Sequence, residues 1–242
     1  MRKSAMKTNA MRKSAMQWRT AVGVGLMFCF MAPVARGACS DSPQAGVDWS
    51  KCEKRRLLLR DADLRKGRFN GTDFGRSDLT GAKFVEADLS EAQLSYAQFK
   101  GADLSRAKLA KAQADRVSLV QSNLAGADLG KAELARADLG GADLTGADLS
   151  KAELGRASLA GAKLDRAVLG GAELERVRLA GASLNGTRME GANLYRARIE
   201  GVDLSSALGL TQAQIAVACG NAATRLPKGL KAPGSWPCAK DD

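Results

Sequence analysis

Large apolar residues recur at every fifth position from Leu64 to Leu204, and a small residue lies two positions before each of them. Of the 29 large positions, 22 are Leu and four are Phe, and the other three are Ala114, Met189 and Ile199. Ala fills 21 of the 29 small positions. The other three positions of each five are mainly polar, charged or Gly. The chain therefore carries one apolar pattern of period five through most of its length.

A period of five matches neither a regular helix nor a flat strand. Helices place apolar residues three and four apart, and half-buried strands place them two apart. A chain that turns a corner every five residues does fit, because it sends one large and one small side chain inward. Coils stacked about 4.8 Å apart then pair their backbone groups in ladders. Leu fills the axis, Ala fits the crowded inner positions, and Gly eases the outer turns.

The run Ala142-Asp143-Leu144-Thr145-Gly146 resembles the A(D/N)LXX signature of pentapeptide repeat proteins, and it continues into Ala147-Asp148-Leu149. The resemblance covers about 60% of the chain, residues 62–206. It implies that family's all-β fold, a right-handed quadrilateral parallel β-helix with four repeats per coil. On that geometry the repeats form about seven coils. Each coil contacts only its neighbours, so both ends of the solenoid need caps.

Residues 38–61 and 207–242 are the expected caps. The first contains Trp49 and enters the first coil through Leu57–Leu59. In the second, Thr211–Gln214 matches a capping box that opens a short helix. We expect Ile215–Ala218 to lay an apolar face over the last coil, Cys219-Gly220 to end the helix, and the tail to Cys238 to form a covering loop. The resemblance also leaves dimerisation through this C-terminal cap open.

Residues 1–37 have the features of a secretory signal peptide. Seven Lys and Arg and no acid precede or flank an uncharged, mostly apolar stretch from Thr20 to Ala35, which is short for a permanent membrane helix. Ala35-Arg36-Gly37 predicts cleavage before Ala38 and a periplasmic or secreted protein. An uncleaved anchor and a lipoprotein acylated at Cys39 are the alternatives. The hexapeptide at Met1 recurs at Met11, so either residue is a possible translation start.

Four cysteines remain after the predicted cleavage site: Cys39, Cys52, Cys219 and Cys238. An even number in an exported chain indicates disulfides. Three pairings are possible, and pairing within each end, Cys39 with Cys52 and Cys219 with Cys238, is the simplest. Zinc binding is disfavoured because the chain has no CxxC pair and no His.

Charge and composition argue against an enzyme. Without residues 1–37 the chain has 30 Lys and Arg against 26 Asp and Glu, a net charge of +4. The absence of His removes Ser-His and Cys-His nucleophile pairs and His metal ligands. No phosphate-binding GxxxxGK[ST] motif occurs. We therefore expect no catalytic residues, no metal and no cofactor.

Four repeats per coil would place residues 20 apart in one column, and this predicts three charged columns. The first is a candidate binding stripe of arginines interrupted once, by Tyr96: Arg76, Arg116, Arg136, Arg156, Arg176 and Arg196. The second contains Lys111, Lys131 and Lys151, and the third Glu133, Glu153 and Glu173. The stripe either binds an anionic partner or is a solvated face that Asp78, Asp115, Asp138 and Glu175 neutralise. Ala114 is a further irregularity, either a local site or a packing flaw.

Two functions are compatible with these features. The first is an exported, non-enzymatic scaffold that binds a protein or an anionic envelope component through an outer face. The second follows from the resemblance alone, because some pentapeptide repeat proteins mimic DNA and bind gyrase in the cytoplasm. That role calls for a strongly acidic surface and no export, and this chain departs from both. Nucleic acid is therefore an unexpected partner.

Overall fold

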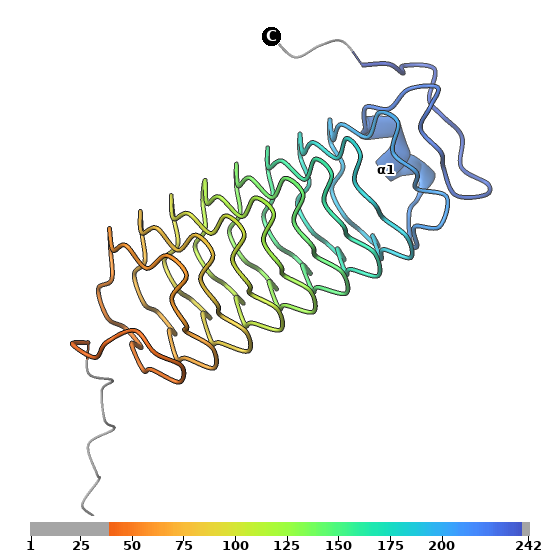
Figure 1. The fold of residues 1–242 in the computed structure, drawn as a ribbon. Helices are drawn as coiled ribbons and strands as arrows, with labels where there is room; N and C mark the ends of the chain where they lie inside the picture. Colours follow the sequence, from red (N-terminus) through yellow and green to blue (C-terminus); the bar gives the residue numbers. More distant parts are fainter. Residues whose placement is uncertain (1–38, 239–242) are drawn as a thin grey trace, which may run out of the picture. The chain divides into compact units, whose positions relative to one another are not determined.

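The computed structural model describes residues 39–238, and these form a coiled solenoid followed by a short helix and a covering loop (Figure 1). The predicted signal peptide at 1–37, its cleavage site and the alternative starts lie outside the described residues. No helix within residues 39–238 is long and apolar enough to cross a membrane.

Parallel backbone bridges join residues 20 apart, so each coil contains four five-residue repeats. One column of bridges links Asp48 to Arg68 and continues at the same spacing to Arg188 and Leu208. Hydrogen bonds run in both directions between coils: the Leu64 amide donates to the Lys83 carbonyl at 2.8 Å, and the Lys83 amide donates to the Ala62 carbonyl at 2.9 Å. Each β segment is a single bridging residue, and the chain turns before a longer strand can form.

The turn between bridges has the same geometry in repeat after repeat. In the turn Leu64–Gly67, the Gly67 amide donates to the Leu64 carbonyl at 3.2 Å, and Lys66 has φ +56°. A positive φ at the third residue of a hydrogen-bonded turn is the type II arrangement. The side chains on both sides of the bridge point inward, whereas those of the bridge and of the two central turn residues point outward.

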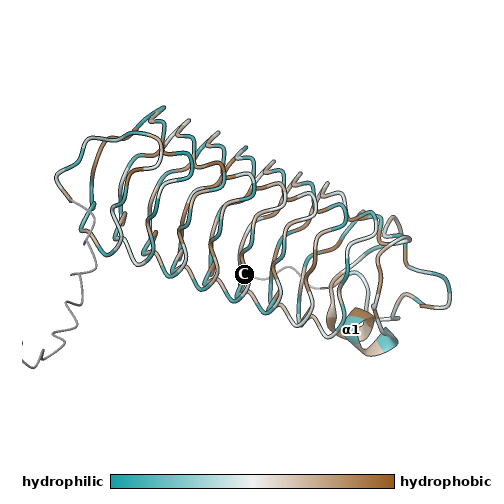
Figure 2. Ribbon diagram, turned by 90° about the horizontal axis from the view of Figure 1, so that it is seen from below, coloured by the Kyte–Doolittle hydropathy of each residue, from teal (hydrophilic) through white to brown (hydrophobic). Residues whose placement is uncertain are grey.

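The interior is filled by the two apolar columns that the sequence predicted. The Leu and Ala positions are almost completely buried, and apolar segments recur in every coil (Figure 2). Aromatic rings fill the N-terminal part: Trp49 and Phe69 have ring centroids 5.8 Å apart, Phe69 and Phe84 5.4 Å, and Phe84 and Phe99 5.6 Å. The large rings give this end more buried apolar area per coil than Leu supplies.

Coil geometry begins earlier than the Leu spacing indicated. Bridges already start at Asp48, Glu53 and Leu58, inside the segment expected to form a cap. The inward positions of this extra coil are filled by residues such as Val47, Trp49, Cys52 and Lys54, which do not match the Leu/Ala pattern. The bridges from Asp48 to Leu208 cover eight steps of 20 residues, about one coil more than the repeat count predicted.

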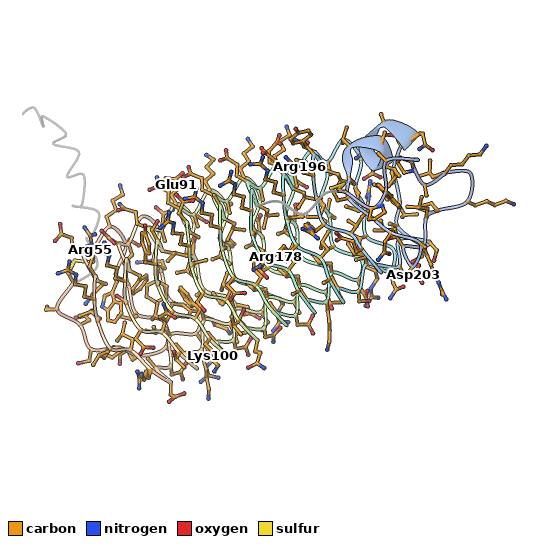
Figure 3. The ribbon with its side chains drawn as sticks, turned by 90° about the horizontal axis from the view of Figure 1, so that it is seen from above. Arg55, Glu91, Lys100, Arg178, Arg196 and Asp203 are labelled. Carbon is orange, nitrogen blue, oxygen red and sulfur yellow. A yellow bond between two sulfur atoms is a disulfide. The ribbon has the colours of Figure 1, made fainter. Side chains whose placement is uncertain are left out.

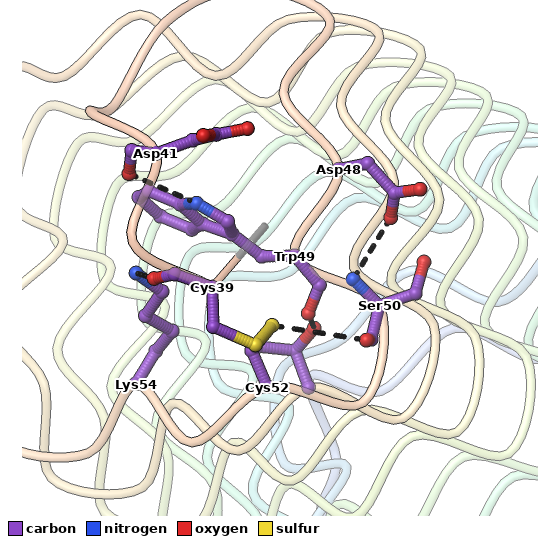
Figure 4. Close-up of a disulfide and its surroundings, with 8 residues drawn as sticks. Cys39, Asp41, Asp48, Trp49, Ser50, Cys52 and Lys54 are labelled. Atoms are coloured by element: carbon purple, nitrogen blue, oxygen red, sulfur yellow. Dashed lines mark hydrogen bonds between the residues drawn. A yellow bond between two sulfur atoms is a disulfide. The ribbon is translucent and has the colours of Figure 1, made fainter. Parts of the chain in front are cut away.

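Lys54 and a disulfide cover the N-terminal end (Figure 4). Lys54 occupies an inward position and is 9% exposed. Its Nζ donates to the Cys39 carbonyl at 2.6 Å and lies 3.8 Å from the centroid of the Trp49 ring. Burial lowers the pKa of Lys54, and the nearby Asp41 carboxylate opposes that shift. Cys39 is bonded to Cys52, which holds this covering segment in place.

Helix α1, Gln212–Val217, covers part of the C-terminal end. The predicted capping box is present: Thr211 Oγ1 accepts from the Gln214 amide, and the Gln214 side chain accepts from the Thr211 amide. Gln214 Nε2 also donates to the carbonyls of Met189 and Ala192 at 2.9 and 2.8 Å. This amide side chain thereby ties the helix to the last complete coil.

The apolar face of α1 is narrower than the sequence predicted. Ile215 and Ala218 are buried, but Ala216 and Val217 are exposed, because residues three apart share one side of the helix and the two between them point away from the core. After α1, Cys219 returns to the solenoid and bridges Arg198, so it does not end the helix. Cys219 is bonded to Cys238, and Trp236 Nε1 donates to the Ala218 carbonyl at 2.7 Å. These contacts hold the covering loop against the last coil.

Candidate binding surface

One corner of the solenoid carries arginine in nearly every coil, and we call it the Arg corner. Its residues share the positive-φ turn position, with φ between +53° and +62°. The structure stacks the predicted stripe and adds Arg56, which the five-residue pattern does not reveal because the first coil lacks the Leu/Ala repeat. The members of the Arg corner are Arg56, Arg76, Tyr96, Arg116, Arg136, Arg156, Arg176 and Arg196.

The other three corners have the same backbone geometry but a different composition. Glycine occupies many of their positive-φ positions, as expected for a conformation that only glycine adopts without strain. The Arg corner has no glycine in any coil. The glycines of the other three corners are Gly46, Gly71, Gly81, Gly101, Gly126, Gly141, Gly146, Gly161, Gly171, Gly181, Gly186, Gly191 and Gly201.

Most guanidinium groups of the Arg corner have no carboxylate partner. Among residues 39–238, no carboxylate lies within 4.0 Å of Arg76, Arg116, Arg136 or Arg156. Of the acids expected to neutralise the stripe, Asp78 accepts from Arg60 at 2.6 Å. Asp138 accepts from the Gly140 amide at 3.0 Å, and Glu175 lies 3.9 Å from Arg176.

Most arginines elsewhere in the described part of the chain are paired with a carboxylate, with Arg166 and Arg178 as exceptions. Arg68 donates to Asp48, and together with the Ser50 hydrogen bonds this lowers the pKa of that carboxyl to about 2. In another corner Glu86 alternates with basic residues and lies 2.9 Å from Arg106 and 3.8 Å from Lys66. The Arg corner differs because it contains no acidic residue along its length.

Tyr96 replaces arginine in one coil of the corner. The guanidinium carbons of Arg76 and Arg116 each lie 5.6 Å from the centroid of the Tyr96 ring. Both cations are within the distance at which an aromatic ring attracts a cation. Tyr96 therefore separates two like charges and orients them.

The two other predicted columns are also stacked. Bridges connect Glu133 to Glu153 and Glu153 to Glu173, and the lysines Lys111, Lys131 and Lys151 lie at the corner on the other side of this acidic column. The acidic column thus lies between the lysines and the Arg corner. Figure 3 shows the charged side chains projecting outward from the coils, with Arg196 labelled.

No group of three or more Cys, Asp or Glu side chains in the described part of the chain is arranged to hold a metal ion. An apolar cavity of about 10 Å³ adjoins Ala114, where the missing Leu side chain leaves space. This volume holds no ligand larger than a water molecule. Ala114 is accordingly a packing flaw of the core.

Known proteins that are similar to this chain also contain five-residue repeats. The family model of pentapeptide repeats matches in eight copies between residues 58 and 208. Comparison with curated protein sequences finds no match.

Solved structures of similar proteins include HetL, a pentapeptide repeat protein involved in heterocyst differentiation regulation in the cyanobacterium Nostoc. It is 30% identical, with a TM-score of 0.40, over 78% of this chain and 90% of that chain. A trypsin-treated variant of QnrB1, a plasmid-mediated fluoroquinolone resistance protein, is 18% identical with a TM-score of 0.54, over 76% and 92%. A thylakoid-lumen pentapeptide repeat protein of Arabidopsis thaliana is 32% identical with a TM-score of 0.29, over 44% and 71%.

Members of this family form right-handed quadrilateral β-helices, the fold that the resemblance implied. The 20-residue bridge spacing and the four corners of each coil agree with that architecture. Because the repeat model spans more than half of the sequence, the chain belongs to the pentapeptide repeat family.

Proposed function

We propose that the protein is an exported, non-enzymatic scaffold that binds an acidic partner through the Arg corner. The observation that carries the proposal is the composition of this corner. Glycine is absent from it, although the same backbone conformation favours glycine in the other three corners. The guanidinium groups of Arg76, Arg116, Arg136 and Arg156 have no carboxylate partner among the described residues.

An acidic partner would relieve the repulsion that this corner contains. Bridged residues in adjacent coils lie about 4.8 Å apart, and two like charges 4 Å apart repel by about 1 kcal/mol in water. Arginine suits carboxylate and phosphate groups because its planar fork donates two parallel hydrogen bonds. A line of such forks therefore favours a ligand with repeated anionic groups.

Charge reversal tests the binding surface. Arg136→Glu combined with Arg156→Glu should abolish the salt-sensitive retention of the protein on immobilised polyanions such as polyglutamate and polygalacturonate. The matched control is Lys131→Glu combined with Lys151→Glu, which makes the same charge change at positive-φ positions of the neighbouring corner. Equal loss in both variants would mean that only net charge matters, and unchanged retention of the arginine variant would refute the proposal.

Export is supported by the features of residues 1–37 and by the two disulfides. Intact mass of the protein from separated cell compartments tests it. We expect a periplasmic or secreted species that starts at Ala38 and is four hydrogen atoms lighter than the same chain with its cysteines reduced. A full-length, reduced, cytoplasmic species would contradict export and favour the alternative, a DNA-mimicking protein that interacts with gyrase.

The alternative lacks support from the surface of this chain. A DNA mimic presents repeated negative charge, whereas residues 38–242 have a net charge of +4 and one corner lined with arginine. The likeness to QnrB1 at 18% identity concerns the fold alone.

A further inference from the structure

Two columns of the solenoid change their composition at the same level, beside Tyr96. The Arg corner has Tyr96 there in place of arginine. On the adjoining face, the acidic column becomes uncharged at Gln93 and Gln113. The turn position between that face and the corner is occupied there by Gly75 and Ser95, which are small, as Ala135 and Gly155 are farther along the same column. The full facing column is Glu53, Asp73, Gln93, Gln113, Glu133, Glu153, Glu173 and Asn193.

These changes coincide with a groove of about 140 Å³. Its walls are formed by the facing column, the small turn residues and the corner: Arg55, Asp73, Gly75, Arg76, Gln93, Ser95, Tyr96 and Gln113. The volume is below the ~300 Å³ of a typical small-molecule site. The groove is therefore too small for a whole drug-sized ligand and would take no more than one unit of a longer one.

The polar groups of the groove are available for a ligand. Neither the Gln93 nor the Gln113 side-chain amide makes a hydrogen bond with a described residue, and each has a donor and an acceptor. The Asp73 carboxylate is already engaged, because it accepts from the Gly75 amide at 2.8 Å and lies 3.5 Å from Arg55. The Arg76 guanidinium is left as the unpaired charge, and Tyr96 holds it from one side.

The Tyr96 ring is not free to stack on a ligand. Guanidinium groups lie at 5.6 Å from the ring centroid in the coil before and in the coil after. Both neighbours along the column are thus cations, and the ring is not a free platform for stacking a ligand. Its role is to orient Arg76 and Arg116.

We infer that the groove beside Tyr96 is a subsite for one acidic sugar residue of an anionic polysaccharide. The Arg76 guanidinium matches the carboxylate of the sugar. The Gln93 and Gln113 amides match its hydroxyl groups, because both amides and hydroxyls donate and accept. The inference rests on the proposed function, since the rest of the polymer would lie along the Arg corner.

The test replaces the two glutamines of the groove with glutamate, the residue found at the equivalent positions of later coils. Gln93→Glu combined with Gln113→Glu continues the acidic column of Glu133 and Glu153 through the groove. The matched control is Gln98→Glu combined with Ser118→Glu, which adds the same charge at outward bridge positions in the same coils. Binding of the full chain to polygalacturonate and to polyglutamate is measured by titration calorimetry at constant ionic strength.

We expect the groove variant to weaken polygalacturonate binding by about tenfold or more, because the sugar carboxylate would face new carboxylates and the sugar hydroxyls would lose the two amide donors. Polyglutamate binding should fall by less than about threefold, as should both affinities of the control. Unchanged polygalacturonate binding, or an equal loss for the two polymers, would overturn the subsite but leave the Arg corner standing. If the wild-type chain binds neither polymer, the proposed function fails as well.

Discussion

Positive φ at one residue in five restricts which side chains the corners accept. The corner residues with positive φ include Arg, Lys, Glu, Gln, Asp, Tyr and Gly, and none is Val, Ile or Thr. A branched Cβ is strained in this conformation at a cost of roughly 1–3 kcal/mol. At the neighbouring central turn position φ is not positive, and Val85 and Val120 are accepted there. Local backbone geometry explains this difference between adjacent surface positions.

Gln121 provides the test, because it has φ +57° and lies outside the Arg corner. We expect Gln121→Val to lower the free energy of unfolding by about 1–2 kcal/mol. Gln121→Gly should change it by less than about 1 kcal/mol, since relief of strain offsets the added freedom of the unfolded chain. Chemical denaturation of the two variants measures both values. Equal effects of Val and Gly would show that the conformation of this corner does not control stability.

At one irregular repeat, a side chain that is smaller than usual lies beside one that is larger than usual, so the buried volume changes less than either replacement alone would change it. Ala114 replaces the usual Leu, and Val117 replaces the Ala that normally follows three residues later. Both are buried beside the apolar cavity of about 10 Å³. The larger Val fills part of the space that the smaller Ala leaves, so we expect the effects of changing these two residues to be coupled.

Replacing both residues restores the common Leu/Ala pair. Ala114→Leu with Val117→Ala should fill the cavity and raise the free energy of unfolding by about 1–2 kcal/mol. Val117→Ala alone should lower it by a similar amount, because the cavity becomes larger. A double-mutant cycle by chemical denaturation measures the coupling. Additive effects would mean that the two side chains do not share the cavity.

The elements that could be predicted from the sequence are those fixed by side-chain volume and period. Leu and Ala, each recurring every five residues, determine the coil. Four repeats per coil then stack residues 20 apart, which places the arginines together. The first coil could not be predicted because Trp49 and Lys54 occupy inward positions there, and nothing in a Leu-based pattern identifies a buried lysine. The groove beside Tyr96 could not be predicted because its volume depends on how side chains of successive coils, about 20 residues apart in the sequence, pack beside one another.

Contacts in the solenoid join each coil only to its neighbours, so we expect unfolding to start at the two ends, where a coil has a neighbour on one side only. The N-terminal end depends on one aromatic side chain and one disulfide. Trp49 is 1% exposed, and the Cys39–Cys52 bond holds the segment that covers it. A disulfide that closes a loop of about this size stabilises by roughly 3 kcal/mol.

Removing that bond should therefore unfold the first coil before the rest. In a chain with Trp18→Phe and Trp236→Phe, fluorescence reports Trp49 alone, and circular dichroism reports the whole solenoid. We expect Cys39→Ser with Cys52→Ser to shift the Trp49 transition to lower denaturant than the dichroism transition, whereas the two coincide when the disulfide is intact. Cys219→Ser with Cys238→Ser is the control, because it removes the disulfide at the other end. In that variant the Trp49 fluorescence transition should still coincide with the dichroism transition. Coincident transitions after loss of the N-terminal bond would show that the coils unfold as one unit.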